Sequence, residues 1–200
     1  MPTITWRSAR ALALAALLAA CGAQGPKFRS TDITGADFGR EFALTGHDGK
    51  PRTLADFRGK LVVLFFGYTY CPDVCPTTLA DMAGVMKALG KDAGRVQVLF
   101  VTVDPERDTR ELLAQYVTAF DPGFLGLYGD TAATERVAKE FKIFYEKRPG
   151  SAPASYSVDH SAQSYVLDGQ GRLRLFVRQD RIAADLADDL RTLLDTARNS

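Results

Sequence analysis

Two cysteines, Cys71 and Cys75, lie in the segment CPDVCP, directly after an apolar run. If a strand passes into a helix there, the amide dipoles at the helix N-terminus lower the pKa of both thiols. The resulting thiolates are nucleophiles and also ligands for soft ions such as Cu(I). Three intervening residues place the sulfurs about one helical turn apart, so they can converge on one ion or form a disulfide. The spacing leaves metal binding, thiol–disulfide exchange and a structural disulfide open.

The chain has two histidines that could add a third ligand to this pair. His47 lies in the turn GHDGK, where polar residues occur for conformational reasons, so we expect an exposed turn residue. His160 lies in SVDHS, after a Pro-, Gly- and Ser-rich segment at residues 146–157 that we expect to be a loop. Loops at the end of a sheet commonly carry binding residues, but a lone histidine is more often structural. Position alone therefore does not make His160 a ligand.

The third cysteine, Cys21, ends the N-terminal segment. Arg7 and Arg10 precede an apolar run at residues 11–20, which is too short for the ~30 Å core of a bilayer and is typical of a secretory signal. The run ends in LAAC, which resembles a bacterial lipobox. This resemblance implies a lipoprotein signal peptide at residues 1–20, and a lipidated Cys21 with a flexible tether at residues 21–35. An ordinary cleaved signal with a free Cys21 thiol and an uncleaved short anchor are the alternatives.

Predicted strands and helices alternate through a single domain at residues 36–200. The expected strands are residues 38–44 and 52–54, which form a hairpin, then 60–67, 96–103 and 124–128, and finally a hairpin of 164–167 and 172–177 around DGQG. The expected helices are residues 76–89, 109–120, 131–141 and 182–197. This order predicts an α/β fold, with a mixed sheet flanked by helices, an N-terminal hairpin and a late hairpin insertion. A cysteine pair at the tip of the first central strand is the thioredoxin-like arrangement.

Two further pairs of side chains lie near these elements. Asp104 and Asp108, in DPERD, follow a predicted strand on the side where Cys71 lies. They could shape a docking surface for a partner, but N-capping and turn formation explain them nearly as well. Met82 and Met86 lie four residues apart on the first predicted helix, and we expect them in the core rather than on a metal.

Composition excludes several classes of protein. The 200 residues are 46% hydrophobic and 24% charged, with a formal net charge of +1, which is ordinary for a globular protein. No basic face or arginine-rich run points to nucleic acid. Three cysteines are too few for a disulfide-rich scaffold.

Three motifs taken together point to one protein family. CPDVCPTTL at 71–79, VDPERDT at 103–109 and VDHS at 158–161, in this order, resemble the Sco/SenC family over residues 36–197. The resemblance implies a membrane-anchored, thioredoxin-like protein that binds copper, as Cu(I) or Cu(II), and is used in assembling the Cu(A) site of cytochrome c oxidase. It places the copper ligands on Cys71, Cys75 and His160.

Residues beside these ligands could assist them. Asp73 and Asp159 would add negative charge, and Asp159 could orient His160, although helix N-terminal and loop solvation are alternatives. Many relatives have histidine where this chain has Tyr70, which puts an auxiliary role for that position in doubt.

The resemblance implies a primary function, and the cysteine pair itself supports an alternative. The first is a copper metallochaperone of the bacterial cell envelope, facing the periplasm or extracytoplasmic side. Its partners would be the oxidase subunit with the Cu(A) site and another copper chaperone or a thioredoxin-like reductase. The second is a thiol–disulfide oxidoreductase in which Cys71 and Cys75 keep oxidase cysteines reduced. A peroxidase fits poorly, because no glutathione-peroxidase or peroxiredoxin cysteine context accompanies CPDVC. A Cys–His hydrolase also fits poorly, because a pair of ligating cysteines has no role in acyl transfer.

Overall fold

The computed structural model describes residues 25–150 and 155–198, so the expected signal peptide at 1–20 and Cys21 lie outside the described residues. The strands are β1 (Thr31–Asp32), β2 (Ala43–Gly46), β3 (Pro51–Thr53), β4 (Leu61–Gly67), β5 (Val96–Thr102), β6 (Leu125–Tyr128), β7 (Tyr145–Pro149), β8 (Tyr156–His160), β9 (Ser164–Leu167) and β10 (Leu173–Val177). The helices are α2 (Val74–Leu89), α3 (Arg110–Thr118), α4 (Thr131–Glu140) and α5 (Ile182–Arg198), with 3-10 turns η1 (Leu54–Phe57), η2 (Gly90–Arg95) and η3 (Gln179–Arg181).

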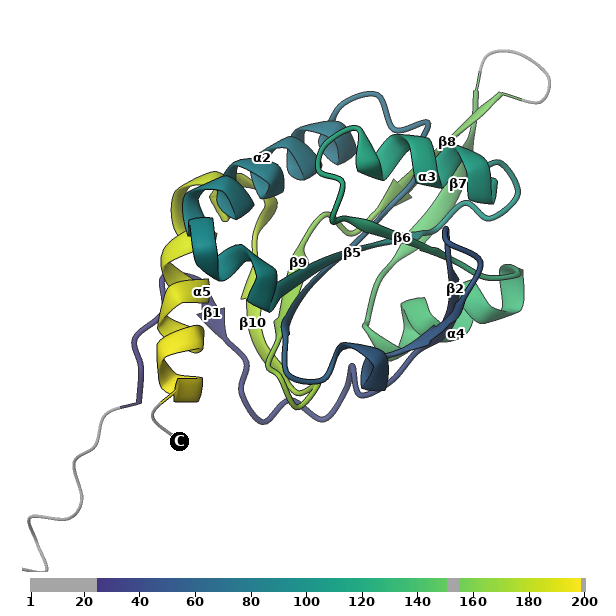
Figure 1. Ribbon diagram of the computed structural model, residues 1–200. Helices are drawn as coiled ribbons and strands as arrows, with labels where there is room; N and C mark the ends of the chain where they lie inside the picture. The colour runs from purple at the N-terminus through teal and green to yellow at the C-terminus, as the bar shows by residue number, and fades with distance from the viewer. Residues whose placement is uncertain (1–24, 151–154, 199–200) are drawn as a thin grey trace, which may run out of the picture.

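Eight strands form one mixed sheet in the order β1-β10-β9-β4-β5-β6-β2-β3 (Figure 1). The central strands β4, β5 and β6 are parallel, and antiparallel strands flank them on both sides. Every residue of β4 is buried, which is why its sequence is a continuous apolar run. The predicted α/β fold with a mixed sheet flanked by helices is confirmed.

Aromatic side chains fill both faces of the sheet, because successive residues of a strand point to opposite sides. Phe65 packs against Phe100 of the neighbouring strand, with ring centroids 5.9 Å apart. Phe66 packs against Phe141, which follows α4, at 5.7 Å. The carboxyl end of β4 is thus held in place from both sides.

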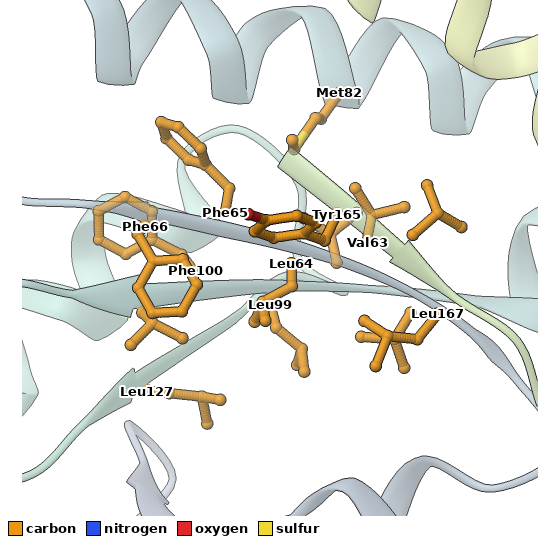
Figure 2. Close-up of a cluster of buried hydrophobic side chains, with 14 of the residues drawn as sticks. Val63, Leu64, Phe65, Phe66, Met82, Leu99, Phe100, Leu127, Tyr165 and Leu167 are labelled. Carbon is orange, nitrogen blue, oxygen red and sulfur yellow. The ribbon is translucent and has the colours of Figure 1, made fainter. Parts of the chain in front are cut away.

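Helices cover the sheet in the arrangement of Figure 1, where α2 and α5 lie side by side. Figure 2 shows Met82 reaching from α2 toward the strands, and its side chain is 1% exposed. Met82 is therefore a core residue, as predicted. Polar caps define two helix starts, since Thr109 accepts a hydrogen bond from the Leu112 amide and Asp130 from the Ala133 amide.

The prediction of a loop at residues 146–157 is wrong. Strands β7 and β8 occupy much of it and form a separate two-stranded antiparallel sheet, in which Tyr145 pairs with His160 and Pro149 with Tyr156. The Pro, Gly and Ser content of this segment indicates a loop when only local preferences are considered. Contacts with distant residues, described below, hold the hairpin instead.

The two predicted hairpins of the main sheet are present. The β9–β10 pair agrees with its predicted bounds within one residue and joins at DGQG. The N-terminal hairpin is shorter than expected: its first strand spans Ala43–Gly46 rather than residues 38–44.

The segment before the domain is attached to it from Arg29 onward. The backbone amides of Arg29 and Ser30 donate to the buried Asp189 carboxylate of α5 at 2.7 and 2.9 Å. Strand β1 then pairs with β10. The second half of the expected flexible tether at residues 21–35 is therefore part of the folded domain.

Substitutions in the central sheet are expected to lower the stability of the fold most. Leu99 of β5 is fully buried, so Leu99→Ala leaves a cavity and lowers the free energy of unfolding by about 2–5 kcal/mol. Urea denaturation followed by circular dichroism measures this change. Lys91→Ala, on the exposed surface of η2, serves as control and stays within about 0.5 kcal/mol of the parent chain; an equal loss in both variants would contradict the assignment of Leu99 to the core.

Candidate metal centre

Cys71 and Cys75 lie where β4 passes into α2. The helix begins at Val74, with Asp73 as N-cap residue, two residues earlier than the predicted start at residue 76. Cys75 is therefore inside the first turn and Cys71 just before it. The Cys75 amide donates to the Cys71 Sγ at 3.4 Å, so the helix N-terminus faces this sulfur as expected from the sequence.

The two thiols differ in exposure and in pKa. Cys71 is partly exposed and Cys75 is fully buried, and neither forms a disulfide. The Cys75 thiol donates to the Cys71 sulfur and, together with His160 and nearby amides, lowers the pKa of Cys71 to about 3 against the effect of burial. The same interaction and burial raise the pKa of Cys75. The expectation that the pKa of both thiols is lowered is therefore wrong for Cys75. At neutral pH the pair is one accessible thiolate and one buried thiol.

His160 completes the cluster from the end of β8. Its Nε2 lies 3.4 Å from the Cys75 Sγ, and its Nδ1 lies 2.9 Å from the Ser161 carbonyl oxygen. Because a carbonyl oxygen only accepts, this contact places a hydrogen on Nδ1 and turns Nε2 toward the sulfurs. The imidazole also packs edge-on against Tyr68 at 5.9 Å between centroids.

The structure brings Cys71, Cys75 and His160 together, with their ligand atoms within 4.8 Å of one another. Two sulfurs and one imidazole nitrogen are donors that suit a soft ion such as Cu(I). A metal ion would bind the Cys75 thiolate, so loading would release the proton that this thiol holds.

Gly67, the last residue of β4, makes room for this cluster. A Cβ atom at this position would lie 2.7 Å from the Cys75 Sγ and 2.8 Å from Phe100 Cε2. Both distances are too short for any side chain. The absence of a Cβ at Gly67 is thus what allows the buried sulfur to lie against the strand, a requirement that sequence reasoning missed.

Asp108 fixes the loop that leads to Cys71. Its buried carboxylate accepts hydrogen bonds from the Thr69 amide and hydroxyl and from the Thr102 hydroxyl. Burial raises the pKa of Asp108, and these bonds oppose the shift. Asp104 is also buried. The idea that Asp104 and Asp108 shape an exposed docking surface is therefore wrong, because both carboxylates are used inside the protein; the N-cap of α3 is Thr109.

The other residues singled out from the sequence have varied surroundings. Asp159 is exposed and pairs with Arg148 at 2.9 Å, because neighbouring side chains of a strand point to opposite sides; the Ser161 carbonyl, not Asp159, contacts the His160 ring. Asp73 is exposed at the helix N-terminus without a side-chain cap bond. Tyr70 is 58% exposed beside Cys71.

His47 is not a simple exposed turn residue. Its Nδ1 accepts a hydrogen bond from the Gly126 amide at 3.0 Å, so it joins the first hairpin to β6. Partial burial lowers its pKa. It lies apart from the cysteine–histidine cluster.

Known proteins resemble this chain over most of its length. A family model described as SCO1/SenC matches residues 30–195. The mitochondrial SCO2 homologue of Bos taurus is 39% identical over 153 residues, which cover 76% of this chain but 58% of that protein. The chain therefore spans less than two thirds of the length of this relative.

Two solved structures share the fold. Copper-bound ScoI from Bradyrhizobium japonicum is 39% identical, with a TM-score of 0.72 over 78% of this chain and 99% of that chain. Apo Sco1 from Thermus thermophilus is 42% identical, with a TM-score of 0.75 over 86% and 99%. The thioredoxin-like fold expected from the sequence is confirmed.

Among the described residues, no helix is both long and apolar enough to cross a bilayer.

The pKa of Cys71 predicts its reactivity. With a pKa of about 3, Cys71 stays a thiolate as the pH falls from 8 to about 5, whereas an ordinary thiol loses about tenfold in thiolate per pH unit below its pKa. Alkylation by iodoacetamide, followed by mass spectrometry of the metal-free protein, should modify Cys71 at a nearly constant rate over this range. Cys75→Ala should shift the pH profile upward more than His160→Ala, since the Cys75 thiol is the largest cause. A wild-type rate that falls tenfold per unit from pH 8 would contradict this.

The space beside Gly67 yields another prediction. Gly67→Ala should displace the Cys75 sulfur and weaken Cu(I) binding by about tenfold or more, measured by competition with a chromophoric chelator. Gly84→Ala is the matched control, because a Cβ there meets open space on α2 and alanine favours helix. Equal affinities in the two variants would show that Gly67 has no role in the site.

Proposed function

Since the chain belongs to the SCO1/SenC family, we propose that it is a membrane-tethered copper metallochaperone. In this proposal one copper binds through Cys71, Cys75 and His160 and is delivered during assembly of the Cu(A) centre of cytochrome c oxidase. The observation that carries the proposal is the cluster of two sulfurs and one imidazole within 4.8 Å, in which Cys75 and His160 are 85 positions apart in the sequence.

The unequal thiols suit a protein that both holds and releases its metal. Cys75 and the Nε2 of His160 form the inner part of the site, and the partly exposed Cys71 forms its outer part. A receiving protein could reach the ion from the side of Cys71 without unfolding of the domain. Thiolates of an incoming protein can replace those of the donor one at a time, which makes such an outer ligand useful.

The site of action is the cell envelope in this proposal. The N-terminal signal and the lipobox-like LAAC at Cys21 support a lipid anchor that holds the domain at a membrane. The proposed partners are the oxidase subunit that carries the Cu(A) site and a second copper chaperone or thioredoxin-like reductase that prepares the cysteines. Because copper binding requires reduced thiols, the reductase would act before copper is loaded.

A second function is favoured by the same pair of thiols. An accessible thiolate beside a buried thiol is also the arrangement of a dithiol reductant. The Cys71 thiolate would attack a target disulfide and form a mixed disulfide. Deprotonated Cys75 would then attack Cys71, so the target leaves with two thiols and the pair becomes a disulfide. Two electrons pass to the target, and His160 need not bind a metal for this reaction.

Copper stoichiometry tests the proposed function. Fully reduced protein, loaded with copper and freed of excess metal, should retain about one copper per chain. Cys71→Ser and His160→Ala should each lose most of this copper when excess metal is removed. With Cu(II) still in solution, His160→Ala should show altered thiolate-to-Cu(II) absorption bands. His47→Asn is the matched control, because an amide oxygen can still accept from Gly126, and it should behave as wild type. Failure of the wild-type chain to retain copper would refute the proposal.

The His160→Ala variant also separates the two functions. If the protein acts only as a reductant, this variant should still reduce a disulfide substrate, and copper retention would be absent in both proteins. If it acts as a metallochaperone, wild type retains copper and the variant does not. Reduction by both proteins together with copper retention by wild type would show that the two activities coexist.

A further inference from the structure

The loop at residues 103–109, which joins β5 to α3, contacts both segments that carry the candidate ligands. We call it the bracket loop. On the cysteine side, its Asp108 binds the amide and hydroxyl of Thr69, two residues before Cys71. On the histidine side, its Asp104, Glu106 and Arg107 contact the β7–β8 hairpin. A single loop is thus bonded to both halves of the site.

Arg107 makes the main contacts on the histidine side. Its Nη1 donates to the Tyr156 carbonyl at 2.8 Å, at the start of β8. Its guanidinium carbon lies 3.5 Å from the centroid of the Tyr156 ring. A charge-assisted hydrogen bond and a cation–π contact to one residue restrain both the backbone and the side chain of Tyr156.

Asp104 joins the same two residues from the buried side. Its Oδ2 accepts from Arg107 Nε at 2.5 Å, and its Oδ1 accepts from the Tyr156 hydroxyl at 2.7 Å. The carboxylate is fully buried, so the Arg107 cation compensates a charge that would otherwise be costly. The ion pair of Glu106 with Lys147 is exposed on both sides and contributes little.

These side-chain contacts help to fix the position of β8. Among the described residues, β7 and β8 pair only with each other and not with the eight-stranded sheet. Tyr156 is held by the bracket loop, and the Val158 amide donates to the Tyr68 hydroxyl at 3.3 Å. His160 follows two residues later on the same strand. Restraint at Tyr156 and Val158, together with packing of the ring against Tyr68 and Phe65, therefore sets where the imidazole lies relative to Cys75.

We propose that Arg107 is a positioning residue of the metal centre: by holding Tyr156 and the start of β8, it keeps the His160 imidazole against the Cys75 sulfur. Arg107 contacts no metal and no ligand atom in this role. The inference rests on the proposed copper function for its second experiment, whereas its first experiment uses the metal-free protein.

Amide hydrogen exchange in the metal-free full chain tests the placement of β8 itself. In Arg107→Ala, the Val158 amide should exchange about tenfold faster or more, because the strand is released from the bracket loop. Central β4 amides should exchange at the wild-type rate. Arg148→Ala is the matched control, because Arg148 lies on the same hairpin but pairs on its exposed side with Glu146 and Asp159. Unchanged Val158 exchange in Arg107→Ala would overturn the proposal.

Copper affinity then tests whether Arg107 acts through His160. Arg107→Ala should weaken Cu(I) binding by about tenfold, while Arg148→Ala binds as wild type. The Cu(II) absorption spectrum of Arg107→Ala should shift toward that of His160→Ala. In the double variant Arg107→Ala/His160→Ala, the affinity should equal that of His160→Ala alone, because the loss is counted once. A double variant about tenfold weaker than His160→Ala would show an effect independent of the imidazole and overturn the proposal.

Arg107→Ala leaves Asp104 without its cation and could fail to fold, so Arg107→Lys is a second test. Lysine keeps a cation beside the carboxylate but lacks the planar fork that also reaches the Tyr156 carbonyl. We expect a folded protein with a smaller affinity loss that is again absent in the His160→Ala background; wild-type affinity in this variant would overturn the proposal. If wild type binds no copper, the proposed function fails, and the exchange experiment still decides the positioning role.

Discussion

The contact between the Cys75 thiol and the His160 imidazole is the constraint on which the rest of the site depends. The two residues are 85 positions apart, and their Sγ and Nε2 atoms lie 3.4 Å from each other. Cys75 reaches this position because Gly67 leaves no atom in its way, and His160 reaches it because a hairpin outside the main sheet carries it there. The low pKa of Cys71 follows, since the protonated Cys75 thiol donates to it.

The sheet and the bracket loop together hold Cys75 and His160 in contact. Strand β4 is clamped by aromatic packing on both faces, so its carboxyl end is a fixed point for the cysteine loop. Buried Asp108 fixes the cysteine loop through Thr69, and buried Asp104 fixes the histidine strand through Tyr156. Buried carboxylates are costly unless fully bonded, and here each of them has at least two donors. The two buried carboxylates therefore position the segments that carry the candidate ligands and add no charge to the surface.

Local sequence signals were enough for the cysteine half of the site and for most of the fold. Apolar runs at β4 and β5, cap residues at Thr109 and Asp130, and the DGQG turn act over a few neighbours, so they can be read in order along the chain. The histidine half could not be reached in this way. Only the family resemblance identifies His160 as a ligand. Local preferences predict a loop where β7 and β8 lie, because the bonds of Tyr156 to Asp104 and Arg107, which hold the hairpin, span about fifty positions. The VDPERDT motif contributes to the resemblance, but nothing in the local sequence indicates a role for Arg107.

The edges of the eight-stranded sheet have a consequence for how other proteins can recognise this one. One edge is β1, which has two residues, and the other is β3, which has three and begins with Pro51. Short edges and a proline leave little unpaired backbone for an added strand from another chain. Strand addition at these two edges is therefore unfavourable, so recognition there depends on side chains, whose identity can discriminate one protein from another.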